Sequence, residues 1–211
     1  MNPTRPTAVL LASGGLDSTT LAYWLREKGI LFRLLFIDYG QHCANTERTR
    51  LAEVLPVGDF GPVTALNVAD IYRGCKSRLI SEPNLWEDHV TADDMYLPYR
   101  NLLVLAIAST YAQANGMSEV YAAFINSNHA KEIDCSAQFF QRLGELLTDY
   151  GSVEIKMPFR DKSKREVAEI GLRLDAPIAR TFSCQAASAV PCGACPNCVD
   201  RLEALNQIDL G

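Results

Sequence analysis

The sequence of 211 residues contains no apolar run of the ~18 residues that suggest a membrane-spanning helix. Residues 1–6 lack the apolar core of a signal peptide, and there is no internal repeat or low-complexity tract. Lys and Arg number 20 against 25 Asp and Glu, which argues against broad electrostatic binding to nucleic acid. We therefore expect a cytoplasmic protein of one domain, residues 1–211, with no membrane or nucleic-acid partner.

Disulfide bonds are not expected either, although the chain has seven cysteines. The cytoplasm keeps thiols reduced, so the spacing of these cysteines needs another explanation. The hydrophobic content of 48% and the charged content of 21% lie near the averages of globular proteins. A chain of this length can bury a full core, and disorder is not indicated.

Strand-like and helix-like segments alternate along the chain. Short apolar runs predict strands at 8–12, 31–37, 62–68, 119–125 and 153–157. Amphipathic segments predict helices at 17–28, 46–55, 101–114, 135–150 and 163–174. This alternation predicts an α/β fold, a Rossmann-like parallel sheet with helices on both faces and a nucleotide site at the carboxyl ends of its strands. The long stretch 71–98 has little periodicity, which is typical of a functional lid or a disordered loop.

The most informative segment of the sequence is residues 12–20, which join the first predicted strand to the first predicted helix. Glycines let a backbone approach a phosphate closely, and the free N–H groups of a first helical turn favour negative charge. The segment lacks the ending of a Walker A sequence and the spacing of a dinucleotide fingerprint. It resembles the pyrophosphate loop of the ATP pyrophosphatases, which implies an ATP site at Ala12, Ser13, Gly14, Gly15, Leu16, Asp17, Ser18, Thr19 and Thr20. The alternative is a plain glycine turn with Asp17 as helix cap.

A cluster of cysteines occupies residues 184–198 with the spacing C-x7-C-x2-C-x2-C. Short spacings let backbone turns aim thiolates at one point, and four thiolates satisfy a closed tetrahedral zinc site. We therefore expect structural zinc in a C-terminal segment, residues 181–211, bound by Cys184, Cys192, Cys195 and Cys198. An iron–sulfur cluster and ordinary buried cysteines are the alternatives.

Four motifs follow one another in an order that resembles the 7-cyano-7-deazaguanine synthase (QueC) family. They are the Ser-Gly-Gly-Leu-Asp-Ser loop at 13–18, Phe-Ile-Asp-Tyr-Gly-Gln at 36–41, Leu-Pro-Tyr-Arg-Asn at 97–101 and the four cysteines. The resemblance covers residues 7–205 and implies an ATP pyrophosphatase fold of the adenine nucleotide alpha hydrolase type, structural zinc and a homodimer. The family uses ammonia and two ATP to convert 7-carboxy-7-deazaguanine to its nitrile, so the implied activity is that of an ATP-dependent ligase forming C–N bonds.

This chemistry requires that pyrophosphate be held and released twice, because both the carboxylate and the intermediate amide must be activated. The resemblance implies that the loop cradles the phosphates through N–H and hydroxyl donors. Asp17 either caps the helix or holds Mg²⁺. Lys164 best matches the lysine of the family's late helix and is assigned to phosphate or adenylate stabilisation, with Lys162 as the second choice. A solvated basic face at a helix start is the alternative for both lysines.

Arg100 matches an arginine of the family, and a guanidinium can hold a carboxylate or phosphate bidentately. A surface salt bridge is its alternative role. Tyr39 and Gln41 follow the second strand, where ligands of open α/β sheets bind. Asp134 can accept the paired N–H donors of a guanine-like edge. The chain departs from the family at 126–134, where both tyrosines of the usual Tyr-Ser-Gly-Tyr-Pro-Asp-Cys stretch are missing.

Two other functions are compatible with these motifs. A related enzyme could activate the same deazapurine carboxylate and join it to another amine, such as one on a protein in a defence system. A nucleotide-binding module without turnover is the alternative from a different class. The intact phosphate loop and Lys164 favour an enzyme over a module.

Overall fold

The computed structural model describes residues 5–84, 87, 91, 93–125 and 135–208. Parallel strands form one sheet of five strands in the order β3-β2-β1-β4-β5. Their bounds are β1 Ala8–Leu11, β2 Phe32–Asp38, β3 Val63–Asn67, β4 Glu119–Tyr121 and β5 Glu154–Lys156. The predicted α/β fold with a parallel sheet is confirmed.

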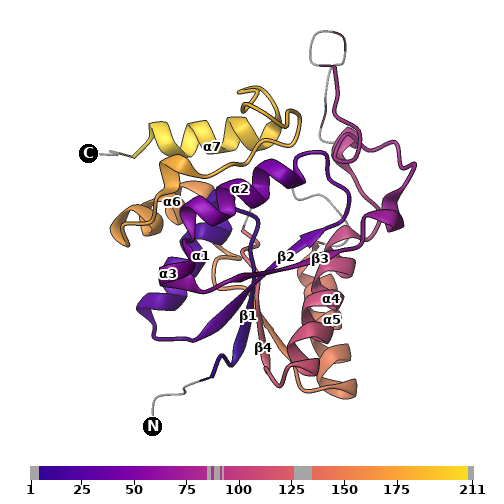
Figure 1. Cartoon of the computed structure of the whole chain (residues 1–211), viewed down its shortest axis with the longest axis vertical. Coiled ribbons are helices and arrows are strands. Elements are labelled where there is room, and N and C mark those ends of the chain that lie inside the picture. The colour runs from indigo at the N-terminus through magenta and orange to yellow at the C-terminus, as the bar shows by residue number, and fades with distance from the viewer. Residues whose placement is uncertain (1–4, 85–86, 88–90, 92, 126–134, 209–211) are drawn as a thin grey trace.

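Helices cover both faces of this sheet (Figure 1). One side carries α1 Leu16–Glu27, α2 Ala44–Val54, α3 Val57–Phe60, α6 Lys164–Arg173 and α7 Pro196–Asn206. The other side carries α4 Arg100–Ala114 and α5 Ala137–Tyr150. Short 3-10 helices are η1 Ala69–Tyr72, η2 Asp93–Met95 and η4 Ile178–Arg180. Among the described residues, no helix combines the length and the apolarity needed to cross a membrane.

The central strand explains the two-sided core. Ala8, Val9 and Leu10 are all fully buried, as expected for a parallel strand covered on both faces. Because side chains alternate along a strand, Leu10 packs into the core beneath α1, whereas Val9 packs into the core beneath α4. The apolar run in the sequence therefore forms the centre of the molecule.

All ten predicted strands and helices are present, but β4 is shorter than predicted and the short helix α3 was not predicted. β4 ends at Tyr121 rather than at residue 125, because its ladder to β1 and β5 ends there and the chain then turns into the pocket described below. α7 was not predicted. Its signal is Pro196 at the first helical position after Cys195, which is a favoured helix start.

The described part of the 71–98 stretch packs against the C-terminal segment. Leu79, Met95 and Leu97 are buried in one cluster with Phe182 and Cys184. A hydrogen bond of 2.7 Å from the Ser188 N–H to Glu82 Oε1 adds a polar tie between the two segments. Segments far apart in the sequence thus share one small core beside the sheet.

Candidate active site

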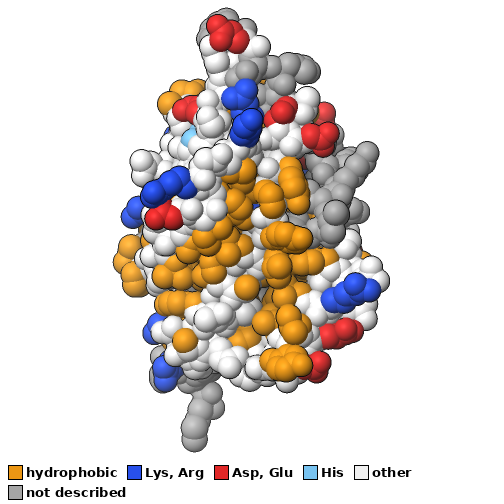
Figure 2. Space-filling view, turned by 90° about the vertical axis from the view of Figure 1, so that its right-hand side faces the viewer, with side chains coloured by type: hydrophobic (Ala, Val, Ile, Leu, Met, Phe, Trp, Pro, Cys, Tyr) orange, Lys and Arg blue, Asp and Glu red, His pale blue; other side chains and the backbone are white. Residues whose placement is uncertain are grey.

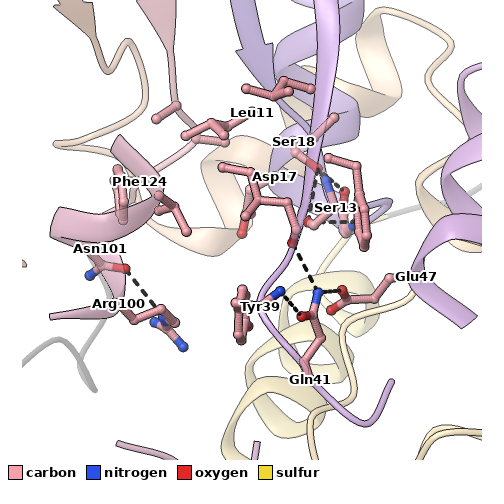
Figure 3. A pocket seen from close by; sticks show the side chains of 18 of the residues that line it. Leu11, Ser13, Asp17, Ser18, Tyr39, Gln41, Glu47, Arg100, Asn101 and Phe124 are labelled. Carbon is pink, nitrogen blue, oxygen red and sulfur yellow. Dashed lines mark hydrogen bonds between the residues drawn. The ribbon is translucent and has the colours of Figure 1, made fainter. Parts of the chain in front are cut away.

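A cavity of about 270 Å³ opens at the carboxyl ends of β1, β2 and β4 (Figure 3). In the strand order of this sheet, the connections that follow β1 and β4 run to opposite faces, and ligands of open α/β sheets bind in the crevice at such a point. Apolar side chains of the strand ends line one wall of the cavity. Polar and charged side chains line the rest, namely Ser13, Asp17, Ser18, Tyr39, Gln41, Glu47, Arg100, Asn101 and Gln185.

Two serines shape the loop between β1 and α1. The Ser13 and Ser18 hydroxyls lie 3.3 Å apart, and Ser18 Oγ accepts the Ser13 N–H at 3.2 Å. Ser13 Oγ in turn lies 3.4 Å from the Gly15 N–H. Gly15 is the N-cap of α1 without a side-chain cap, so the loop presents hydroxyl and N–H donors to the pocket at the positive end of a helix.

Gly14 brings this loop against α2. Its φ is +73°, and a Cβ at this position would lie 2.8 Å from the Leu51 nitrogen and 2.9 Å from the Glu47 carbonyl oxygen. Both neighbours are backbone atoms that cannot rotate away. Only glycine therefore fits this close approach.

A partly buried ion pair links α1 to α6. Lys164 Nζ lies 2.6 Å from Asp17 Oδ2, and the two side chains are only 17% and 22% exposed. Asp17 Oδ1 is buried and has no hydrogen-bond partner in the described chain. Lys164 is positioned because α6 begins at this residue behind a capping box formed by Ser163 and Glu166. The sequence prediction named both members of this pair.

The other residues of the predicted ATP loop are divided between the pocket and the core. Ala12 lines the pocket, whereas Leu16 is buried in the core. Thr19 and Thr20 are fully buried on α1, and neither hydroxyl has a hydrogen-bond partner among the described residues. Thr20 faces α6, where a Cβ on Gly171 would approach its hydroxyl to 2.6 Å, so the two helices pack closely.

Arg100 stands at the start of α4, on the opposite side of the pocket from Glu47 (Figure 3). The preceding turn is held by Tyr72, whose hydroxyl donates to the Pro98 carbonyl at 2.9 Å. Tyr72 also packs edge-on against Tyr39, with ring centroids 6.2 Å apart. Burial raises the pKa of Tyr39 well above its ordinary value, and the nearby Arg100 opposes this increase. Tyr39 is therefore a neutral hydroxyl beside a cation.

Gln41 and Glu47 form the floor between these two sides. Gln41 Nε2 donates to Glu47 Oε2 at 2.9 Å and to the Ile37 carbonyl at 3.3 Å. Gln41 Oε1 accepts the Tyr39 N–H at 2.9 Å, so the amide is fixed in orientation. The Cys43 thiol donates to Glu47 Oε1 at 3.4 Å. Burial raises the pKa of the Glu47 carboxyl, and the bonds from Gln41 and Cys43 partly offset this increase.

Asp134, the predicted contact for the purine edge, lies outside the described residues. Its neighbour Cys135 is described, and Cys135 Sγ accepts a hydrogen bond of 2.7 Å from Asn101 Nδ2. Asn101 is buried and lines the pocket. The chain that follows the 126–134 segment is thus attached to the pocket wall. Lys162 does not line the pocket and forms no salt bridge within the described chain.

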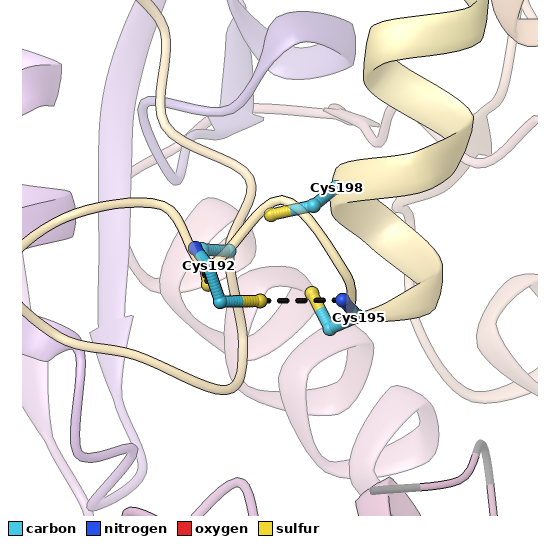
Figure 4. A group of neighbouring side chains, drawn as sticks. Cys192, Cys195 and Cys198 are labelled. Atoms are coloured by element: carbon cyan, nitrogen blue, oxygen red, sulfur yellow. Dashed lines mark hydrogen bonds between the residues drawn. The ribbon is translucent and has the colours of Figure 1, made fainter. Parts of the chain in front are cut away.

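The four cysteines of the C-terminal segment converge on one point (Figure 4). Their sulfur atoms lie within 4.8 Å of one another, close to the spacing of about 3.8 Å that follows from Zn–S bonds of about 2.3 Å in a tetrahedron. Cys198 lies in the first turn of α7, and its hydrogen bonds with Cys184 and Cys195, together with burial, raise the pKa of its thiol. Hydrogen bonds from the Cys195 and Cys198 thiols lower the pKa of Cys184. This donor set fits a metal ion that prefers sulfur.

The cysteine segment also touches the pocket. The Phe182 N–H donates to the Gly14 carbonyl at 3.0 Å, so the chain just before Cys184 runs along the phosphate loop. Gln185 lines the pocket, and its Oε1 accepts a hydrogen bond of 2.5 Å from Asn197 Nδ2 on α7. His42 Nε2 lies 3.0 Å from the Gln185 carbonyl. The pocket and the cysteine cluster are therefore one continuous assembly.

The sequence profile described as "Queuosine biosynthesis protein QueC" matches residues 7–209. The chain belongs to the QueC family. The resemblance noted in its motifs is thereby confirmed, and with it the membership of a family of ATP-dependent ligases that form carbon–nitrogen bonds. 

Relatives of QueC type match over almost their whole length. A 7-cyano-7-deazaguanine synthase of Halobacterium salinarum is 32% identical over 95% of this chain and 91% of its own. One of Methanospirillum hungatei is 32% identical over 96% of both chains. Among solved structures, the NMN synthetase from Francisella tularensis aligns with a TM-score of 0.48 at 19% identity, over 87% of this chain and 68% of that chain.

Two pocket residues of this QueC-family chain escaped the sequence reasoning. Glu47 is a single acid in a predicted helix, a position that is usually solvated. Gln185 follows a predicted metal ligand but carries no motif of its own. Neither has a local signal, because both reach the pocket only through the packing of distant segments.

Proposed function

We propose that this chain is a 7-cyano-7-deazaguanine synthase. It adenylates 7-carboxy-7-deazaguanine with ATP, converts the activated acid to an amide with ammonia, and activates the amide again to eliminate water as the nitrile. The observation that carries the proposal is one pocket with a phosphate loop and the Asp17–Lys164 pair on one side and Arg100 on the other. The family membership supports the same chemistry.

The loop is assigned to ATP. Ser13, Gly15 and Ser18 donate to the phosphates, and Lys164 stabilises the charge that develops as pyrophosphate leaves. The unpartnered Asp17 Oδ1 fits a ligand for Mg²⁺, which takes one or two carboxylates together with substrate phosphates. Bound there, Mg²⁺ neutralises phosphate charge. Lys162 remains the second choice for the lysine role.

Arg100, Tyr39 and Gln41 are assigned to the deazapurine acid. The Arg100 guanidinium can hold a carboxylate or an adenylate phosphate bidentately. Tyr39 supplies a neutral hydroxyl donor beside it, and Gln41 fixes the floor of the pocket. Asp134 is assigned to the guanine-like edge on its chemistry alone, because a carboxylate accepts two parallel N–H donors.

The four cysteines are assigned to one structural Zn²⁺ in the segment 181–211 of a single domain, residues 1–211. A closed set of four sulfur ligands leaves no open coordination position, so this zinc supplies folding energy rather than chemistry. All seven cysteines are free thiols, which fits a reducing compartment, and we place the protein in the cytoplasm.

We also assign a homodimer to the face formed by α4 and α5. Figure 2 looks onto this side of the molecule and shows apolar side chains in a broad band. Leu146 and Tyr150 of α5 are 53% and 84% exposed, and Ile107 and Tyr111 of α4 are half-buried. Large contiguous apolar patches mark interaction sites, and a second copy offers the same patch to a symmetric contact.

The test is acid-dependent turnover. With 7-carboxy-7-deazaguanine, ATP, Mg²⁺ and ammonium, the protein should form AMP and pyrophosphate, and mass spectrometry should detect the nitrile. Asp17→Ala and Ser13→Ala should abolish pyrophosphate release while circular dichroism shows an intact fold. If an unrelated acid stimulates AMP formation and the deazapurine acid does not, the substrate assignment is wrong.

A second candidate rests on the altered sequence at 126–134, which lacks the tyrosines of the typical family stretch. In this function the chain activates the same acid and passes it to another amine, including one on a protein. The same mass spectra decide between the two, because an amide-linked product without nitrile identifies the second candidate. A protein that binds ATP without releasing pyrophosphate is a nucleotide-binding module.

A further inference from the structure

The pocket contains a negative charge that the roles assigned above do not use. Its two carboxylates are Asp17 and Glu47. Asp17 is neutralised by Lys164 at 2.6 Å. Within the described chain, no Lys, Arg or His nitrogen lies in salt-bridge distance of Glu47. Arg100 and His42 act on Glu47 only beyond salt-bridge distance. A largely buried carboxylate without a close cationic partner is costly, and such a charge is neutralised by a bound cation or by a proton.

The surroundings of Glu47 keep this charge accessible to a small cation. The carboxylate accepts one bond from Gln41 Nε2 and one from the Cys43 thiol, so each of its oxygens retains a free lone pair. The Gln41 amide is itself locked by the Tyr39 N–H and the Ile37 carbonyl. Glu47 therefore cannot turn away from the cavity without breaking bonds that hold the pocket floor.

We propose that Glu47 binds the ammonium ion that the ligase reaction consumes and takes a proton from it. The inference rests on the proposed function, in which ATP and the acid are both anions and ammonium is the cationic reactant. Mg²⁺ suits this position less well, since it prefers near-octahedral oxygen ligands that include substrate phosphates. One carboxylate with amide neighbours matches a singly charged ion that donates hydrogen bonds.

The position of Glu47 suits attack on the activated acid. Arg100 and Glu47 lie on opposite sides of the pocket, with Tyr39 and Gln41 between them (Figure 3). An acid bound at Arg100 and an ammonium ion bound at Glu47 would therefore lie in one cavity on opposite sides. The acid would compensate the charge of Arg100, and ammonium would compensate that of Glu47. This arrangement also keeps the two bound reactants from competing for one subsite.

Ammonium gives one proton to a Glu47 oxygen, and the ammonia so formed attacks the acyl carbon of the adenylate. The carbon–nitrogen bond forms, the bond from that carbon to the AMP oxygen breaks, and AMP leaves with the electron pair. The nitrogen then loses its extra proton to water, and Glu47 releases the proton that it took to water, which restores its carboxylate. The raised pKa of the carboxyl makes Glu47 a better proton acceptor than an exposed glutamate.

The experiment measures two half-reactions of Glu47→Gln in the full-length protein. Exchange of labelled pyrophosphate into ATP, driven by the acid in ammonium-free buffer, reports adenylation alone. Amide formation at varied ammonium chloride reports the ammonium KM. We expect this KM to rise on the order of tenfold or more in Glu47→Gln, because a charge-assisted contact is lost. The KM for ATP in the exchange reaction should change far less. Glu47→Asp, which keeps the charge, should recover part of the ammonium affinity.

Glu53→Gln is the matched control, since Glu53 lies on the same helix and pairs with Arg50 at the surface. It should leave the ammonium KM at the wild-type value. An unchanged ammonium KM in Glu47→Gln, with exchange active, overturns this inference and leaves the proposed function standing. Absence of acid-driven exchange in the wild type overturns the proposed function, and the ammonium site with it.

Discussion

At the scale of single residues, the pocket holds two carboxylates in opposite electrostatic situations. Asp17 has a lysine at 2.6 Å, whereas Glu47 has only neutral donors in the described chain. In the first arrangement the two opposite charges compensate each other. In the second, the Glu47 carboxylate lacks a close cation, which lowers the stability of the folded state. Functional sites commonly carry such a cost in stability.

Because Lys164 pairs with Asp17, we expect substitutions of Lys164 and Lys162 to differ in their effect on stability and activity. Lys164→Ala leaves a largely buried carboxylate without its partner, so we expect it to lower the free energy of unfolding by about 1–3 kcal/mol. Lys162→Ala, two residues earlier and outside α6, has no salt bridge in the described chain and should change it by less than about 0.5 kcal/mol. Urea denaturation measures both. Pyrophosphate release should be lost in Lys164→Ala and retained in Lys162→Ala, and equal effects would contradict the assignment of Lys164.

Glu47 predicts a pH-dependent stability. Burial raises its pKa above the ordinary value of 4.5, so the folded state binds more protons than the unfolded state above that pH. The free energy of unfolding contributed by this group is therefore complete below pH 4.5 and falls as pH rises through the folded pKa. Glu47→Gln removes the ionisable group, so the free energy of unfolding no longer falls with pH for this reason.

We expect Glu47→Gln to unfold at a higher temperature than wild type at pH 7, with the difference vanishing below pH 4.5. Thermal unfolding followed by circular dichroism across this range gives the answer. Glu53→Gln, an exposed control, should show no such trend. A Glu47→Gln protein less stable than wild type at pH 7 would mean that the carboxylate is stabilising.

At the scale of elements, the approach of the phosphate loop to α2 depends on Gly14. Gly14→Ala introduces both an unfavourable positive φ and a contact of 2.8 Å with backbone, so we expect a loss of about 2–4 kcal/mol. Gly29→Ala, just after the C-terminal end of α1, has a similar φ of +69° but nothing within 4 Å of the new Cβ. It should cost only the strain, about 1–2 kcal/mol. Equal losses in urea denaturation would show that the contact relaxes.

We expect the C-terminal element to depend on a bound metal ion. We expect one zinc per chain, and removal by a chelator should raise the hydrogen exchange of residues 181–208 more than that of β1 and β2. Metal analysis and exchange followed by mass spectrometry test this. Iron with visible absorption, or unchanged exchange after metal removal, would contradict a structural zinc site.

Most elements could be predicted because their signals are local. Period and turn residues placed ten strands and helices, and the loop at 13–18 and the four cysteines are contiguous patterns with a direct chemical meaning. The Asp17–Lys164 contact was reachable only through the family resemblance, since it joins distant helices. Glu47 and Gln185 could not be predicted, because a single acid or amide has no periodicity and its burial depends on tertiary packing. The role of Asp134 stays a prediction.

At the scale of the whole molecule, the apolar face of α4 and α5 predicts an oligomer (Figure 2). The double variant Leu146→Glu with Tyr150→Glu should convert a dimer to a monomer, because it places charges in a contact that excludes water. Val57→Glu is the control, a 63% exposed residue of α3 on the other side of the sheet. Light scattering after size exclusion measures both, and a monomeric wild type would contradict the prediction.

The bond from the Phe182 N–H to the Gly14 carbonyl has a consequence for biosynthesis of the protein. During translation the phosphate loop at 13–18 is made about 165 residues before Phe182, which lies on it, and before Gln185, which lines the pocket. A nascent chain therefore carries the nucleotide motif long before it carries a nucleotide site. A chain that stops before residue 182 lacks both the contact to Gly14 and the part of the pocket wall that Gln185 supplies.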